Sequence, residues 1–215
     1  MFQKACSQLR NSIFGVRAGI KNHGQITYSL GSGFLIAPDI IATTAHGMRD
    51  LSTGVHHNFF EVICSADIGK HPVPAELIFQ DPSTDVAFLR VINGNYNSVV
   101  TMSGEFVNKG TMIGTLGFPL SEMTNGVWIL KERFQHGFVS GFYPHNFYGH
   151  MIQFYETDNL MYSGSSGCPA FTSDGVVIGM QCGNLNSKQG NQLSISIVAT
   201  AASILDLAKA NTLLT

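Results

Sequence analysis

The sequence predicts an all-β protein made of two β units of roughly equal size, followed by one C-terminal helix. Short apolar runs alternate with turn-forming residues along the chain, as in proteins built from many short strands. The 23 glycines and 15 phenylalanines among 215 residues fit this pattern. Apolar residues at helical spacing are convincing only near the end of the chain. Strand groups with such spacing form barrels or sandwiches.

The first unit contains six candidate strands, each an apolar run bounded by turn residues. They lie at residues 12–20, 26–37, 39–46, 59–66, 73–80 and 85–92. The polar, turn-rich stretch 93–108 follows them and is the best place for a boundary. We therefore expect an N-terminal β-barrel domain at residues 1–98 and a C-terminal one at residues 99–215.

The second unit repeats this organisation with six further candidate strands. They lie at residues 111–118, 126–143, 150–157, 167–173, 175–183 and 192–199. The segment after them has apolar residues at 204, 205, 207, 208 and 213, which is helical spacing. The sequence thus predicts a terminal helix near residues 201–211.

Composition excludes several classes of protein. A hydrophobic content of 44% with 12% charged residues is typical of a folded chain, and the net charge of −2 gives no reason to expect a nucleic-acid partner. No apolar segment approaches the roughly 20 residues that span a bilayer, so membrane insertion is not expected. The first residues lack an apolar run of signal-peptide length. Cytoplasm is therefore the default location, with the periplasm or secretion as the alternative if a leader has been removed.

The four cysteines form no CxxC pair and no dense framework, so free thiols in a reducing compartment are expected. No pattern in the chain indicates a cofactor. A metal site formed by His56, His57, Cys64 and His71 is one open alternative, although their spacing fits no standard zinc pattern.

The segment YSGSSGCPAF, residues 162–171, is the strongest candidate for chemistry. Gly164 and Gly167 flank Ser166 closely, and glycine backbones adopt conformations that other residues avoid. Such a turn exposes a hydroxyl and directs the N–H groups of Gly164 and Ser166 to one point, as an oxyanion hole requires. A serine nucleophile also needs a base, and the base needs an orienting acid.

The first unit offers both groups. His46 ends the apolar run IIATTAH, and Asp85 opens the apolar run DVAFLRV. Asp81, in QDPSTD, is interpreted as a turn residue. With base and acid on one unit and the nucleophile on the other, a cleft between the units is expected.

Three segments carry a resemblance to a known family. GSGFLIAPDIIATTAH, DVAFLRV and TDNLMYSGSSGCPAF resemble the signature segments of chymotrypsin-like serine proteases, most closely those of the HtrA/Deg branch. The resemblance runs from about residue 12 to 208. It implies two perpendicular six-stranded β-barrels with a catalytic triad at their interface.

The resemblance further implies a serine endopeptidase that cleaves proteins or peptides through an acyl-enzyme. His46 would be the general base, Asp85 the orienting acid and Ser166 the nucleophile, with the oxyanion held by the N–H groups of Gly164 and Ser166. The oligomeric state stays open.

The family's pattern also places a specificity pocket. Leu160, six residues before Ser166, would form its floor, and Cys182, Gly183 and Asn184 its wall. A leucine floor offers no partner for a buried charge, so small or medium aliphatic residues are expected before the scissile bond.

The sequence departs from the family pattern in several places, and each leaves an alternative. Ser165 stands where digestive proteases carry an acidic residue, and Cys168 replaces the second glycine of SGGP. The segment after the protease signatures does not resemble a PDZ domain, so none is expected. The alternatives are a latent or inactive peptide-binding module of the same fold, and catalysis by Cys168 in place of Ser166.

Overall fold

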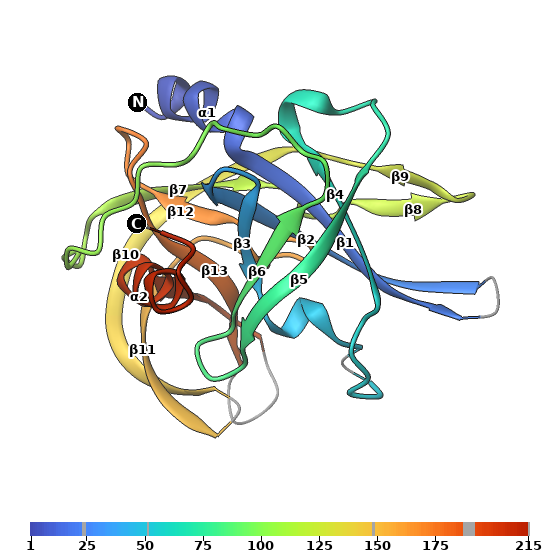
Figure 1. Cartoon of the computed structure of the whole chain (residues 1–215). Coiled ribbons are helices and arrows are strands. Elements are labelled where there is room, and N and C mark those ends of the chain that lie inside the picture. Colours follow the sequence, from blue (N-terminus) through green and yellow to red (C-terminus); the bar gives the residue numbers. More distant parts are fainter. Residues whose placement is uncertain (23–24, 51, 148, 187–191, 215) are drawn as a thin grey trace.

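Six strands of the first half of the chain close into a barrel in the order β1-β2-β3-β6-β5-β4 (Figure 1). These strands are β1 (Ile13–Asn22), β2 (Gln25–Ala37), β3 (Ile40–Thr44), β4 (Phe59–Cys64), β5 (Val73–Asp81) and β6 (Val86–Val91). The computed structural model describes residues 1–22, 25–50, 52–147, 149–186 and 192–214.

A second barrel follows in the order β10-β11-β14-β13-β12-β7. Its strands are β7 (Met112–Gly117), β10 (Arg133–Phe147), β11 (His150–Thr157), β12 (Pro169–Phe171), β13 (Val177–Asn186) and β14 (Gln192–Thr200). The all-β fold of two six-stranded barrels is therefore confirmed.

The C-terminal helix is also confirmed, as α2 (Ala201–Ala210). Thr200 caps its first turn, because the Thr200 Oγ1 accepts a hydrogen bond from the Ser203 N–H at 3.1 Å. Ile204 and Ala208 of α2 belong to the same apolar cluster as Met180 of β13 and Ala199 of β14. No helix among the described residues is both long enough and apolar enough to cross a membrane.

An N-terminal helix, α1 (Gln3–Leu9), was not expected from the sequence. Seven residues are too few to show helical periodicity, and such a short helix is unstable alone. It is held by packing on the second barrel, where the Phe2 ring meets those of Phe134 and Phe171 at centroid distances of 5.3 and 5.8 Å. Three short 3₁₀ segments complete the helical structure: η1 (Arg10–Ser12), η2 (His46–Met48) and η3 (Ser65–Asp67).

The expected single strand at 126–143 is wrong. Its first part forms β9 (Val127–Ile129), which pairs with the preceding strand β8 (Glu122–Thr124) in a separate hairpin, and β10 begins only at Arg133. Asn125 and Gly126 at the hairpin tip both have positive φ, 51° and 78°. Asn-Gly is the preferred pair for such a two-residue turn, so a readable signal was present in the sequence.

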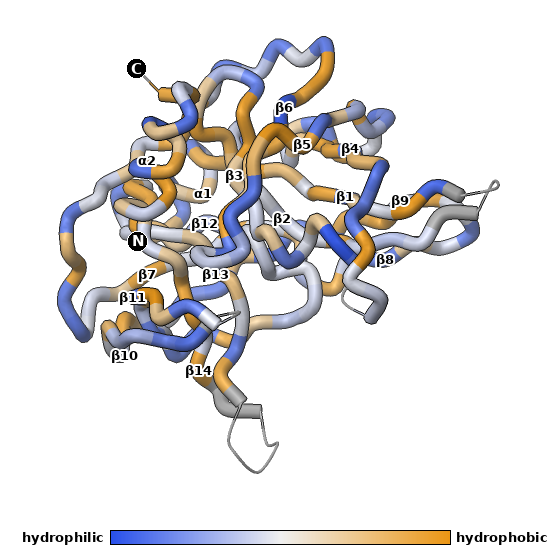
Figure 2. Tube along the Cα trace, turned by 60° about the horizontal axis from the view of Figure 1, so that its bottom comes forward, coloured by the Kyte–Doolittle hydropathy of each residue, from blue (hydrophilic) through white to orange (hydrophobic). Residues whose placement is uncertain are grey.

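The largest apolar cluster joins the two barrels. It contains fully buried phenylalanines from both, including Phe34 and Phe88 of the first barrel and Phe118, Phe154 and Phe171 of the second half. Outside this cluster, β9 also carries hydrophobic residues, on the hairpin that extends beside β1 (Figure 2). The shared cluster fixes the barrels against each other and so determines which strand ends meet between them.

Phe88→Ala should lower the free energy of unfolding by about 3–5 kcal/mol, because it removes a fully buried ring and leaves a cavity. Phe106→Ala is the matched control: the Phe106 side chain is 59% exposed, so the loss should be about 1 kcal/mol. Urea unfolding of both variants measures the difference. Equal losses would contradict the assignment of Phe88 to the shared core.

Candidate active site

His46 and Asp85 lie side by side because their strands are neighbours in the first barrel. β3 and β6 are antiparallel, and Thr44 at the end of β3 pairs with Val86 at the start of β6. The first two residues beyond β3, Ala45 and His46, therefore lie beside Asp85, the residue just before β6. Pairing of β3 with β6 is thus the structural reason that two residues 39 positions apart come together.

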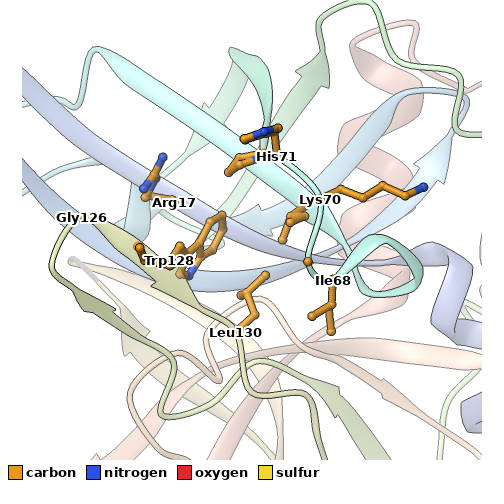
Figure 3. A pocket seen from close by; sticks show the side chains of 11 residues that line it. Arg17, Ile68, Lys70, His71, Gly126, Trp128 and Leu130 are labelled. Carbon is orange, nitrogen blue, oxygen red and sulfur yellow. The ribbon is translucent and has the colours of Figure 1, made fainter.

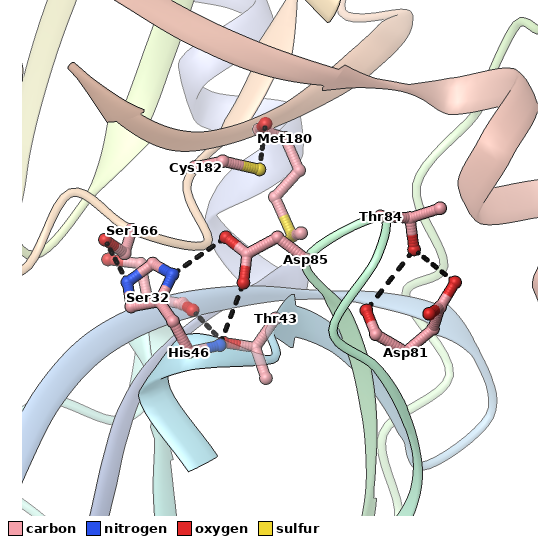
Figure 4. A network of polar contacts seen from close by, with 9 residues as sticks. All are labelled: Ser32, Thr43, His46, Asp81, Thr84, Asp85, Ser166, Met180 and Cys182. Atoms are coloured by element: carbon pink, nitrogen blue, oxygen red, sulfur yellow. Dashed lines mark hydrogen bonds and ion pairs between the residues drawn. The ribbon is translucent and has the colours of Figure 1, made fainter. Parts of the chain in front are cut away.

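A chain of hydrogen bonds runs through three side chains from both barrels (Figure 4). The Asp85 Oδ1 accepts from the backbone N–H of His46 at 2.8 Å, and the Asp85 Oδ2 lies 2.7 Å from the His46 Nδ1. The His46 Nε2 lies 3.0 Å from the Ser166 Oγ. A carboxylate facing Nδ1 favours the tautomer with the proton there, which leaves Nε2 as an acceptor for the serine hydroxyl.

Asp85 is held in an unusual conformation. Its side chain is 0% exposed and its φ is 57°, in the left-handed region. Aspartate tolerates this region better than most residues. The Asp85 carbonyl also accepts from the Ala45 N–H at 3.1 Å. The backbone segment that carries His46 is therefore hydrogen-bonded directly to Asp85.

Asp81 is the neighbouring carboxylate and has a different environment. Its Oδ1 accepts from the Ser83 N–H at 2.9 Å, and its Oδ2 accepts from the Thr84 Oγ1 at 2.9 Å (Figure 4). These bonds close a local turn. Among the described residues, the side-chain hydrogen bonds of Asp81 go to Ser83 and Thr84 and none goes to the imidazole, in keeping with the turn role expected for Asp81.

Two glycines shape the turn that carries Ser166. Gly164 and Gly167 both have φ of 89°, which favours glycine. A Cβ atom on Gly164 would come within 2.6 Å of the Phe118 carbonyl oxygen, and one on Gly167 would overlap the Ser32 carbonyl. The turn therefore accepts no side chain at either position.

Two backbone N–H groups of this turn are available to an oxygen atom. The Ser163 carbonyl accepts from the Leu120 N–H at 2.7 Å, and the Ser165 carbonyl accepts from the Cys168 N–H at 2.9 Å. In a trans peptide the N–H points opposite to the C=O. The N–H groups of Gly164 and Ser166 are thus directed away from those partners, and neither has a protein partner among the described residues.

Ser32, on β2 of the first barrel, holds the turn that carries Ser166 by hydrogen bonds across the barrel interface. Sequence reasoning did not identify this residue. Its N–H donates to the Ser166 carbonyl and its Oγ donates to the Gly164 carbonyl, both at 2.8 Å. The same Oγ accepts from the Phe118 N–H at 2.9 Å. The Ser32 carbonyl accepts from the Thr43 Oγ1 at 2.8 Å. The only available signal was its place in the GSGF segment.

The four residues expected in a specificity pocket have different surroundings. Leu160 is 49% exposed. The Asn184 Nδ2 donates to the Met161 carbonyl at 3.1 Å, so this amide joins β13 to the segment before Ser166. Gly183, next to Asn184, pairs with Ile197 of β14 after a bulge in the strand.

Cys182 has its side chain in the interior, so it offers the cleft only its backbone. Burial and the nearby Asp85 carboxylate raise the pKa of the Cys182 thiol well above its ordinary value. The thiol thus packs behind Asp85, on the side away from His46 (Figure 4).

A cavity of about 240 Å³ opens beside His46 and Ser166. Its other walls come mainly from β1, β2 and the β3–η2 segment of the first barrel, with Ser163 and Gly164 from the second. None of the four expected pocket residues lines it. It is therefore distinct from the specificity pocket that the sequence predicted.

The other nucleophile candidate, Cys168, is buried. Burial raises the pKa of the Cys168 thiol to about 12, although hydrogen bonding with Ser32 and Phe118 opposes the shift. The metal alternative finds no support either. His71 lines a separate cavity, and the Cys64 Sγ faces the Asn11 carbonyl at 3.5 Å. In the part of the chain that the structure describes, no three His, Cys, Asp or Glu side chains are grouped to hold a metal ion.

Known proteins that are similar in sequence to this chain are peptidases. The family model described as a trypsin-like peptidase domain matches residues 31–180. A probable periplasmic serine endoprotease, DegP-like, from Halomonas elongata is 28% identical over 194 residues, or 88% of this chain. A protein of the same description from Pseudomonas putida is 30% identical over 156 residues, or 71% of this chain. The chain spans only 36% and 28% of these two relatives' own lengths.

Solved structures share the fold. A protease from M. tuberculosis in its active form has a TM-score of 0.74 at 20% identity, covering 95% of this chain and 82% of its own. An HtrA-type protease with a tripeptide has a TM-score of 0.75 at 19% identity, covering 97% of this chain and 62% of its own.

The buried thiols should be unreactive in the folded protein. With the Cys168 pKa near 12, only about one thiol in 10⁴ is thiolate at pH 8, and the thiolate is the reactive form. Iodoacetamide should therefore modify the partly exposed Cys6 first, and Cys168 and Cys182 only after unfolding in urea. Mass spectrometry of labelled peptides distinguishes the sites. Rapid labelling of Cys168 in the native protein would contradict this picture.

Proposed function

Because the chain belongs to the trypsin-like peptidase family, we propose that it is a serine endopeptidase of the HtrA type that hydrolyses protein or peptide substrates. The observation that carries the proposal is the continuous hydrogen-bonded chain from Asp85 through His46 to Ser166. Each member has the partner that nucleophilic catalysis by serine needs.

In this proposal Ser166 is the nucleophile and His46 the general base. The His46 Nε2 takes the hydroxyl proton as the Ser166 Oγ attacks the scissile carbonyl, and Asp85 orients the imidazole and stabilises its charged form. His46 then protonates the leaving amine, which leaves an acyl-enzyme on Ser166. A water molecule, deprotonated by His46, attacks the acyl carbon and releases the second product.

The N–H groups of Gly164 and Ser166 would stabilise the negative oxygen of each tetrahedral intermediate. Their lack of protein partners supports this role, as does their orientation by the bonded Ser163 and Ser165 carbonyls. The same orientation favours an active enzyme over a latent peptide-binding module. In a latent form we would expect one of these carbonyls to occupy the position of the oxyanion.

The proposed substrate preference is for small or medium aliphatic residues before the scissile bond. Leu160 brings no charge to the expected floor, and the nearby Asp158 is engaged elsewhere, since its Oδ1 accepts from the Phe138 N–H at 2.6 Å. The hydrogen bond from the Asn184 Nδ2 to the Met161 carbonyl joins the expected wall to the residue that follows the expected floor. A shallow, uncharged pocket follows, and each methylene in it is worth about 1–3 kcal/mol.

Domain organisation and location are also proposals. We assign residues 1–98 and 99–215 to two domains, since the strands of each barrel fall within one of these ranges. The two bacterial relatives are described as periplasmic, which favours the periplasm over the cytoplasm for this chain too.

Ser166→Ala should lower the turnover of an unfolded protein substrate by about 10⁵-fold or more. The activity that remains would come from substrate binding and the oxyanion hole. A fluorophosphonate probe should label Ser166 in the parent protein and nothing in the variant. Ser7→Ala, at an exposed serine of α1, is the matched control and should keep full activity. Full activity of Ser166→Ala, or labelling at another residue, would refute the assignment.

Profiling with a peptide library should show graded cleavage after small or medium aliphatic residues. The gradation follows from the modest free energy of each methylene group in the pocket. Dominant cleavage after Arg or Lys, or after Asp or Glu, would show that Leu160 is not the floor of the pocket.

A further inference from the structure

The cavity beside His46 and Ser166 has the size of a site for a single side chain. Its volume of about 240 Å³ lies below the roughly 300–1,000 Å³ of sites that bind drug-sized molecules. It also lies next to the two side chains that would carry out the reaction. A side chain of the substrate, close to the bond that is cut, is therefore its most suitable occupant.

The lining of this cavity offers little to a charged group. Among the residues that the structure describes, no Asp, Glu, Lys or Arg lines it. Leu30, Gly31 and Gly47 are half-buried and contribute accessible surface to it. Val16 and Ala18 also line it but are at most 2% exposed, so we place them at its closed end. An ionised side chain in the cavity would lack a dedicated partner, which is costly.

Two glycines keep the cavity wide. Neither Gly31 nor Gly47 has the positive φ that requires glycine. Among the described residues, a Cβ atom on Gly47 would contact only the Thr44 Oγ1, at 3.4 Å. One on Gly31 would contact only the Ser166 carbonyl oxygen, at 3.3 Å. The small size of these two residues, and not a demand of the backbone, therefore leaves the space beside them open.

The cavity is placed for the leaving side of a substrate. In the reaction proposed above, the His46 Nε2, which lies 3.0 Å from the Ser166 Oγ, protonates the leaving amine. The residue after the scissile bond carries that amine nitrogen. The pocket expected for the residue before the bond is formed by Leu160 and residues 182–184, and none of these lines the cavity. The cavity beside His46 is thus suited to the residue after the bond.

A polypeptide has room to continue beyond this cavity. Ser29, Leu30 and Ser163 line both this cavity and another one of about 410 Å³. Neither His46 nor Ser166 lines the larger cavity, so it leads away from the reacting atoms. The chain beyond the leaving residue can therefore pass from the smaller cavity into the larger one, as cleavage within a protein requires.

We propose, resting on the peptidase function above, that this cavity binds the side chain of the residue after the scissile bond. Gly31 and Gly47 make it selective for medium-sized apolar side chains such as valine and leucine. Glycine at this position of the substrate leaves the cavity unfilled, and aspartate brings a charge without a partner.

Transfer of an acetyl group to added amines measures this selectivity directly. p-Nitrophenyl acetate acetylates Ser166 and releases p-nitrophenol. An added amine then attacks the acetyl carbon, and its proton passes through His46 to the Ser166 Oγ as the C–O bond breaks. The acetyl group is small, so the result does not depend on the pocket at Leu160. Ser166→Ala gives the background from direct reaction of amine and ester.

Leucinamide should capture the acetyl group at least about tenfold more often than glycinamide or the α-amide of aspartate at equal concentration. The assay is run at about pH 9, where α-amines are largely neutral, and mass spectrometry counts the N-acetyl products. Acetylation of Ser166 with equal capture by the three amides would overturn the proposal and leave the peptidase function intact. No acetylation of Ser166 would refute the peptidase function and the proposal with it.

Gly47→Ala should lower the advantage of leucinamide over glycinamide by about tenfold, because the added methyl group takes the space of one methylene of the ligand. Gly104→Ala is the matched control: a Cβ there would lie 3.5 Å from Ala202, and Gly104 does not line the cavity. Its ratio should equal that of the parent. The ratio of two amides cancels any common effect on His46. An unchanged ratio in Gly47→Ala would overturn the role assigned to this glycine.

Discussion

The hydrogen bonds of one buried serine, Ser32, join the two barrels at the turn that carries Ser166. Its N–H and Oγ hold two carbonyl oxygens of that turn, and the Thr43 Oγ1 holds the Ser32 carbonyl from behind. Each of these buried polar groups would lose its partner if the turn moved, at a cost of about 1–3 kcal/mol per group. The position of Ser166 relative to His46 therefore depends on a contact made by neither residue's side chain.

The conformation of Asp85, the acid of the hydrogen-bonded chain, also depends on hydrogen bonds that offset an unfavourable backbone. The left-handed backbone of Asp85 is less favourable than a regular strand, by about 1–2 kcal/mol for most residues. Two hydrogen bonds from His46 to the carboxylate and one from Ala45 to the carbonyl offset this cost. Complete burial then prevents water from competing for the carboxylate. Local strain and tertiary contacts thus select one orientation of the imidazole.

Sequence reasoning predicted the fold well, because apolar runs and glycine-rich turns report directly on strands and their ends. The two groups of strands and the helix α2 were predicted in this way, whereas the closing of each group into a barrel was implied by the family resemblance. The helix α1 was not, because its stability comes from the distant Phe134 and Phe171 rather than from its own pattern. The β8–β9 hairpin was missed although its Asn125–Gly126 turn is a local signal.

For the candidate site, the sequence pointed to the residue types and their order along the chain, which local motifs carry. The clamp by Ser32 and the interior position of the Cys182 side chain depend on how two barrels meet. No local pattern encodes such contacts. The cavity lined by Arg17 of β1 and Trp128 of β9 (Figure 3) likewise depends on a strand and a hairpin that are more than 100 positions apart, as the contact between Arg17 and Met123 illustrates.

The docking of α1 on the second barrel has a consequence for the order in which the chain acquires its structure during synthesis. The ribosome releases α1 well before Phe171, whose ring receives Phe2. The first barrel can close as soon as β6 is available, since domains fold as units during synthesis. Seven residues form no stable helix alone, so α1 must wait, unstructured, beside an already folded barrel. A segment that is synthesised before both barrels is then ordered only after the second barrel has formed.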